Sequence, residues 1–405
     1  MFFPDRTTTC LNLLIAVLLV HNWLVRDSVV AKWDRLKASD QLRITEATEA
    51  LDDNGRVLVF GWSSQYLNRI DFAKARPRLW GVPLPARLQL RKMDCFLFFF
   101  RGKVAQVHLA HLGHSFALLF HLYSFEEQQT LFWQSDFGAF YSLGRSFPDM
   151  ADNPFDGHSH GLRLENADLA FQLTADENPA KNTFLTELVL TLKDGSFKAK
   201  LVSERFKSQE DFYEVYPTSA DRSSFVAHFK GFESVCEGYL SFGGKYHNLM
   251  NSNCVSLLSQ SRGFHPRKSQ GVWAAASGRL PSGSFFSLNL GQHSHEPGLT
   301  ASSEDFFKTD GVVQKLSPIA VDLDSRDELG RVVLRTVEKF RNSRGKAEVL
   351  FSPQREHVVE RKDLLFSFHK RTVFGLFQGY VITDKGVPLN FEGIPGFVEL
   401  SRYTM

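Results

Sequence analysis

The chain has 405 residues and a net charge of +2, from 47 basic and 45 acidic side chains. This balance gives no excess of positive charge for nucleic acid, so we expect no nucleic-acid partner. The 43% hydrophobic content is typical of a globular protein, and the length allows two domains. Phenylalanine is unusually frequent, with 38 Phe against 9 Tyr and 6 Trp. Because Phe has no polar group, this bias predicts a dry aromatic core or a cavity for an apolar ligand.

Residues 1–40 contain the most apolar segment, LNLLIAVLLVHNWLV at 11–25. We predict an apolar helix here that anchors the protein in a membrane. More positive charge follows the segment than precedes it, which predicts a cytoplasmic main body. The strictly apolar run is short for a membrane-spanning helix. Two alternatives therefore remain: a signal peptide that is cleaved on secretion, and a helix docked on the domain.

Beyond residue 40 the pattern predicts short strands separated by tight turns. Leu188, Leu190 and Leu192 alternate with other residues before the turn at Asp194-Gly195, and Phe197 begins a second alternating run. This combination is typical of β-hairpins. Residues 93–136 predict four successive strands that are apolar on both faces, as inside a sandwich or facing the lumen of a barrel. A short helix is expected at 43–52.

We predict an all-β, mainly antiparallel protein with an N-terminal apolar helix at 1–40. Its two β-rich halves, each a barrel or a sandwich, span 41–215 and 216–405. The boundary is placed near the polar stretch at 207–224, KSQEDFYEVYPTSADRSS.

Several blocks of the sequence carry a family resemblance. They include DNG at 53–55, FGW at 60–62, SRG at 261–263, SLNLG at 287–291 and the glycine-spaced block at 374–399. With these blocks the chain resembles, over about residues 44–402, the uncharacterised family of domains of unknown function numbered 2804. More distantly, the resemblance implies tandem calycin-type β-barrels, a group that includes carotenoid hydratase-like enzymes. It implies no catalytic residues.

Four residues within these blocks are candidates for binding a ligand: Trp273, Arg262, Asn289 and Glu399. Pockets combine apolar walls with a few placed polar groups, and Arg262 and Asn289 could orient a ligand's polar end. The alternative is that these residues are structural.

The histidines suggest two further interpretations. Residues 158–160 and 293–295 each read His-Ser-His, and alternate residues of a strand share one face. His158 with His160, and His293 with His295, are therefore candidate metal ligands. Polar turns of no function are the alternative. We expect His108, in a β pattern, to be a hydrogen-bonded sheet histidine. We find no dinucleotide or phosphate-loop motif, and we expect no cofactor.

Together these features favour a protein that binds a hydrophobic, lipid-like small molecule in a β-barrel cavity near a membrane. The alternative is an enzyme, such as a hydratase, isomerase or hydrolase, that acts on an apolar substrate. Such an enzyme needs a buried acid–base pair, which the histidines, Asp136, Glu165 or Glu399 could supply. A structural interaction module is a third possibility.

Overall fold

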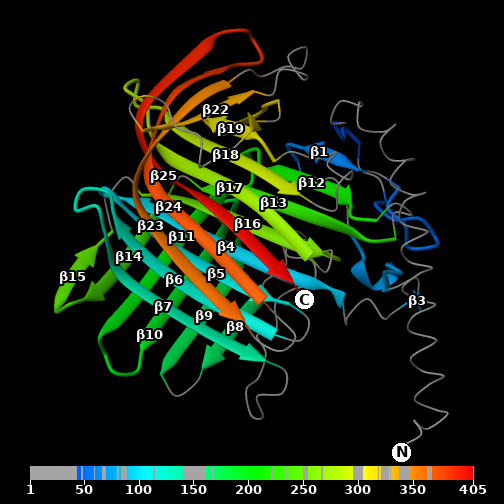
Figure 1. Ribbon diagram of the computed structural model, residues 1–405, viewed down its shortest axis with the longest axis horizontal. Coiled ribbons are helices and arrows are strands. Elements are labelled where there is room, and N and C mark those ends of the chain that lie inside the picture. The colour runs from blue at the N-terminus through cyan, green and yellow to red at the C-terminus, as the bar shows by residue number, and fades with distance from the viewer. Residues whose placement is uncertain are drawn as a thin grey trace, which may run out of the picture.

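The computed structural model describes residues 43–404 apart from internal gaps, of which the longest are 140–159, 295–303, 321–327 and 337–346. The described chain is built almost entirely of antiparallel strands in three large sheets (Figure 1). The remaining elements are a short 3-10 helix, η1 (Phe72–Lys74), and a two-stranded ribbon, β2 (Arg78–Leu79) with β3 (Val82–Pro83). The prediction of an all-β antiparallel protein is confirmed.

The first sheet has eight strands in the order β1-β12-β13-β16-β4-β5-β6-β7. The predicted four-strand run at 93–136 is confirmed, because β4 to β7 are consecutive neighbours in this sheet. In order along the sheet, the strands are β1 (Gly61–Ser63), β12 (Phe212–Pro217), β13 (Phe225–Glu233), β16 (Val255–Gly263), β4 (Arg91–Phe100), β5 (Lys103–His111), β6 (Ser115–Ser124) and β7 (Gln129–Ala139).

The second sheet has six strands and covers one face of the first. Its hairpin β10–β11 turns at the predicted Asp194-Gly195 position. Its inward side chains, Phe171, Leu188 and Phe197 among them, share one core with Phe98 and Phe120 of the eight-stranded sheet. The strands are β15 (Lys245–Asn248), β14 (Val235–Phe242), β11 (Phe197–Phe206), β10 (Thr183–Leu192), β9 (Leu169–Asn178) and β8 (His160–Glu165).

The third sheet has nine strands and surrounds a core of its own, which holds Phe286, Phe307, Phe351 and Val398. The long red and orange strands in Figure 1 belong to it. In order, its strands are β20 (Val312–Lys315), β19 (Phe306–Thr309), β18 (Phe285–Ser294), β17 (Lys268–Arg279), β25 (Pro388–Thr404), β24 (Ser367–Ile382), β23 (Ala347–Lys362), β22 (Val332–Thr336) and β21 (Ile319–Ala320).

A separate core joins the nine-stranded sheet to the second face of the eight-stranded sheet. Leu97 and Tyr123 of the eight-stranded sheet meet Phe374 and Phe397 of the nine-stranded sheet there. The eight-stranded sheet is therefore covered on both faces, which explains why its strands are apolar on both sides. We call it the central sheet.

The short helix expected at 43–52 is wrong for the residues described there. Arg43 forms a parallel bridge with Trp62, and Leu51 forms an antiparallel bridge with Val57. The Asp52 carboxylate accepts hydrogen bonds from the backbone N–H groups of Asn54 and Arg56, so the chain turns back instead of continuing as a helix.

Two other predictions remain open. The apolar helix predicted at 1–40 lies outside the described residues; within the described part, no helix is both long and apolar enough to cross a membrane. The division between residues 215 and 216 stays a prediction. In the structure, strands from both sides of that point join the central sheet, and the nine-stranded sheet begins after β16.

Candidate functional site

Polar side chains gather where the central sheet faces the nine-stranded sheet. Strand pairing places Lys230, Ser259, Cys95 and His108 opposite one another on adjacent strands, so they share the face that looks toward the nine-stranded sheet. Gln106 is two residues from His108 on β5, so it lies on the same face.

The nine-stranded sheet presents a matching set. Trp273 on β17 lies opposite Glu399 on β25, and Glu399 lies opposite Thr372 on β24. Lys370, two residues before Thr372, projects from the same face. We call this buried group the polar seam, defined by Cys95, Gln106, His108, Lys230, Trp273, Asn289, Lys370 and Glu399.

His108, Lys370 and Glu399 form the centre of the polar seam. The Lys370 Nζ lies 2.6 Å from His108 Nε2 and 2.8 Å from Glu399 Oε2. His108 Nε2 is 3.6 Å from the same carboxylate oxygen, to which Gln106 Nε2 also donates at 3.3 Å. The side chains of His108, Lys370 and Glu399 are 18%, 5% and 9% exposed. A proton donor and a proton acceptor are therefore in contact at a buried position.

Burial, and after it the charge of Lys370, holds the pKa of His108 well below its usual value. The imidazole is therefore neutral near pH 7. Because Lys370 donates to Nε2, that nitrogen is the acceptor and the ring proton is on Nδ1. Burial also raises the pKa of the Cys95 thiol, whose Sγ lies 3.5 Å from His108 Nε2, so the thiol is protonated.

A second set of contacts continues the polar seam beyond Trp273. Its indole Nε1 donates to Asn289 Oδ1 at 2.9 Å, and Asn289 Nδ2 donates to the backbone oxygen of Glu304 at 2.6 Å. The Lys230 Nζ lies 4.3 Å from the centre of the Trp273 ring and 2.9 Å from Glu304 Oε2. Burial lowers the pKa of Lys230 to about 7.

Aromatic rings surround these polar groups. Trp273 packs edge-on against both His108 and Phe397, and Phe374 stacks on Tyr123 from the opposite sheet. The arrangement of a few polar groups between aromatic walls is typical of sites for largely apolar ligands.

Three of the four predicted ligand-binding residues come together in the polar seam: Trp273, Asn289 and Glu399. Arg262 lies apart. It follows Ser261 on β16. Ser261 lies on the face of the central sheet that carries the polar seam, so Arg262 points to the other face. There it is buried in a two-point ion pair with Asp94, at 2.7 and 3.1 Å. This geometry supports a structural role.

The other acid–base candidates lie elsewhere. Glu165 is in exposed ion pairs with Arg163 and Lys193, and Asp136 is on the edge strand β7 opposite Leu118, which packs into the core of the other face. The candidate metal ligands His158, His160, His293 and His295 have no described side chains, so metal binding there stays a prediction.

His108 is hydrogen-bonded within a sheet, as expected. Sequence reasoning missed its partner Lys370, which is 262 residues away in the chain. Lys370, Thr372 and Phe374 occupy alternate positions, and a period of two marks residues on one face of a strand. Nothing in the pattern shows that a second sheet covers that face.

Fold and site together define an all-β protein with a cluster of ionisable side chains buried between two sheets. The chain belongs to the family described as Domain of unknown function (DUF2804), whose model matches residues 41–404. The resemblance seen in the sequence is thereby confirmed. No curated protein matches the chain in sequence.

The solved structures to which the chain is similar share little sequence with it. CghA with Sch210972 has a TM-score of 0.48 at 9% identity, covering 91% of this chain and 97% of that one. Kievitone hydratase from Nectria haematococca has a TM-score of 0.39 at 11% identity, covering 78% and 88%. A putative AttH from Nitrosomonas europaea has a TM-score of 0.34 at 11% identity, covering 77% and 91%. We draw no functional conclusion from similarities at this level.

Proposed function

We propose that this protein is an enzyme that moves a proton on a largely apolar small molecule, as an isomerase or a hydratase does. The observation that carries the proposal is the contact of His108 with Lys370 and Glu399 in the polar seam. Burying an ammonium, an imidazole and a carboxylate together costs stability that apolar residues of similar volume would not. Clusters of this kind are frequent at sites of acid–base chemistry.

Each group has a defined role in this proposal. The substrate oxygen replaces His108 Nε2 as the acceptor of the Lys370 ammonium, and the freed Nε2 of neutral His108 accepts a proton from carbon next to a carbonyl or a similarly activating group. The imidazolium then returns this proton to another carbon of the substrate, which restores the neutral ring. The Lys370 ammonium donates to the oxygen on which negative charge develops, and Glu399 holds Lys370 in place. Trp273 and the neighbouring Phe rings contact the apolar part of the substrate.

The second candidate function is ligand binding without catalysis. The aromatic walls of the polar seam would suit a hydrophobic, lipid-like ligand equally well. A calycin-type barrel and a membrane location through residues 1–40 also remain proposals.

Deuterium incorporation separates the two candidates. The full-length protein is incubated in D₂O with an apolar extract of the cells that make it, and the small molecules are examined by mass spectrometry. We expect one compound to gain deuterium at carbon or to gain the mass of water. The variants His108→Gln and Glu399→Gln should reduce this rate at least about 100-fold.

The matched control is His369→Gln. His369 precedes Lys370 on β24, and its side chain therefore projects from the opposite face of the strand. This variant should keep the wild-type rate. If the wild-type protein and His108→Gln bind the same compound and both release it unaltered, the enzyme proposal is wrong and the binding function stands.

A further inference from the structure

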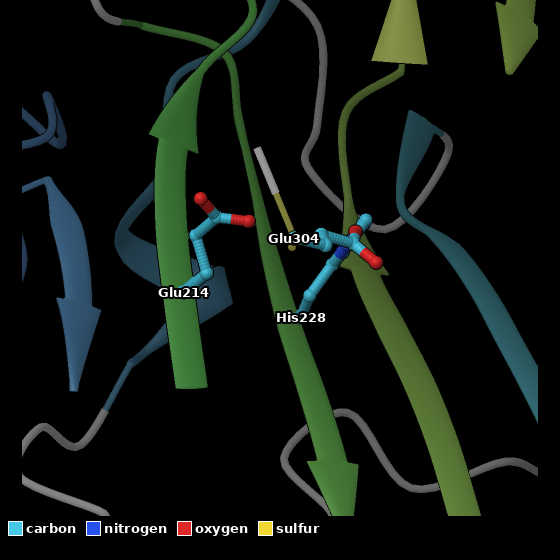
Figure 2. A group of neighbouring side chains, drawn as sticks. All are labelled: Glu214, His228 and Glu304. Atoms are coloured by element: carbon cyan, nitrogen blue, oxygen red, sulfur yellow. The ribbon is translucent and has the colours of Figure 1, made fainter. Parts of the chain in front are cut away.

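A second buried cluster lies at the end of the polar seam, beyond Lys230. Glu214 on β12 is directly opposite His228 on β13, and Glu304 reaches them from just before β19 in the nine-stranded sheet. All three are buried, and one ligand atom from each lies within 4.8 Å of the other two. Figure 2 shows Glu214 and His228 on neighbouring strands and the Glu304 carboxylate against the His228 ring.

The donor set is one imidazole nitrogen and two carboxylates. First-row divalent ions bind these groups at about 2.0–2.2 Å. Ligand atoms around such an ion lie roughly 3–4 Å apart by the same geometry, so small side-chain rotations would bring the three groups to bonding distance. A divalent cation would also match the negative charge of the two buried carboxylates.

Neighbouring residues hold the donors in place. The Tyr216 hydroxyl lies 3.4 Å from His228 Nε2, so Nδ1 is the nitrogen that faces Glu304. Such a partner on the far nitrogen is typical of histidines that bind metals. Gly291 leaves room for Glu304, because a Cβ at this position would lie 2.8 Å from the Glu304 Cβ and 3.0 Å from its Oε2.

The amine of Lys230 already contacts the cluster. Lys230 lies two residues from His228 on β13, and its Nζ is 2.9 Å from Glu304 Oε2. The Trp273 ring, 4.3 Å from the same Nζ, offers the ammonium a second partner if it leaves the carboxylate.

We propose that Glu214, His228 and Glu304 bind one divalent transition-metal ion, and that the ammonium of Lys230 competes with this ion for Glu304. The proposal is independent of the chemistry at His108, since ion binding is measured without a substrate.

The test uses full-length protein that has been stripped with a chelator and titrated with Zn²⁺ and with Mn²⁺ by calorimetry. We expect about one ion per chain, with affinity lowered at least about 10-fold in Glu214→Gln and in His228→Gln. Lys230→Met should bind the ion more tightly than wild type, because the competing charge is gone. A merely structural Lys230–Glu304 pair would give no such gain.

The controls are Glu187→Gln, at a half-buried glutamate paired with Lys200, and His369→Gln; both should keep wild-type affinity. Saturating ion should raise the melting temperature of the wild type but not of Glu214→Gln, which also shows whether that variant is folded. The proposal is overturned if the wild type binds no ion at 100-fold excess. It is equally overturned if Glu214→Gln and His228→Gln bind normally while His158→Ala or His293→Ala abolishes binding.

Discussion

The protonation of individual side chains in the polar seam depends on their burial and on neighbouring charges. His108 is the clearest case, since burial and the facing cations Lys370 and Lys230 all disfavour its protonated form. Among the residues that the structure describes, Glu399 is the carboxylate in contact with it, and Lys370 already pairs with that carboxylate. The neutral imidazole is therefore the form that the folded protein stabilises.

Because the folded protein favours the neutral imidazole of His108, its free energy of unfolding depends on pH. The pKa of His108 is lower in the folded chain than in the unfolded chain, so the unfolded chain binds more protons as the pH falls below about 6.5. We expect the free energy of unfolding to fall in acid by up to about 1.4 kcal/mol per pH unit from His108 alone. Burial lowers the pKa of His121 as well, so a second contribution of the same sign is expected.

Urea unfolding between pH 8 and pH 5 measures this slope. His108→Asn should show a smaller loss of stability over that range than wild type, while the His121 contribution remains. Equal slopes in the two proteins would show that folding does not lower the pKa of His108.

At the scale of strands, two glycines of the family-like block, Gly375 and Gly396, are explained by contact between backbones. Gly375 on β24 lies opposite Gly396 on β25. A Cβ at Gly396 would lie 2.4 Å from the backbone oxygen of Ala275, and one at Gly375 would lie 2.2 Å from that of Ser352. These two glycines thus allow neighbouring strands to approach closely.

Alanine at position 396 should destabilise the folded protein. We expect Gly396→Ala to lower the free energy of unfolding by about 1–3 kcal/mol, because the strand backbone has to shift. Gly278→Ala is the matched control on β17, since the nearest atom to its Cβ would be the end of the Ile394 side chain at 3.2 Å, with no backbone atom among its three nearest neighbours. Chemical denaturation compares the two. A cost for Gly278→Ala as large as that for Gly396→Ala would contradict the explanation.

The whole molecule is joined by its central sheet, which packs on a different sheet at each face. Across the face that carries the polar seam, the rings of Phe374 and Tyr123 stack with centroids 4.5 Å apart and planes 11° apart. Phe374 is fully buried. The two sheets should therefore lose stability together when this contact is removed.

Hydrogen exchange tests the coupling. We expect Phe374→Ala to cost about 3–5 kcal/mol and to reduce amide protection in both β6 and β24. Phe171→Ala, in the core on the opposite face, should reduce protection in the six-stranded sheet and leave β24 protected. Loss of protection in β24 alone after Phe374→Ala would show that the sheets are stable independently.

The sequence by itself determined the local elements. Turn dipeptides and alternating residues predicted the hairpin at Asp194-Gly195 and the run of strands at 93–136, because hairpin geometry depends on residues that are neighbours in the chain. The prediction of a short helix at 43–52 was wrong, because the pairing of Arg43 with Trp62 outweighed a weak helical pattern.

Only the tertiary structure decided the site. Trp273, Asn289 and Glu399 were recognisable in the sequence as candidates, whereas the face of the central sheet on which Arg262 lies is set by strand pairing. His108 meets Lys370, and Glu214 with His228 meets Glu304, across two sheets from distant parts of the chain. A period of two shows which residues share a face, whereas the partner of that face depends on how whole sheets pack, and packing of sheets leaves no local signal.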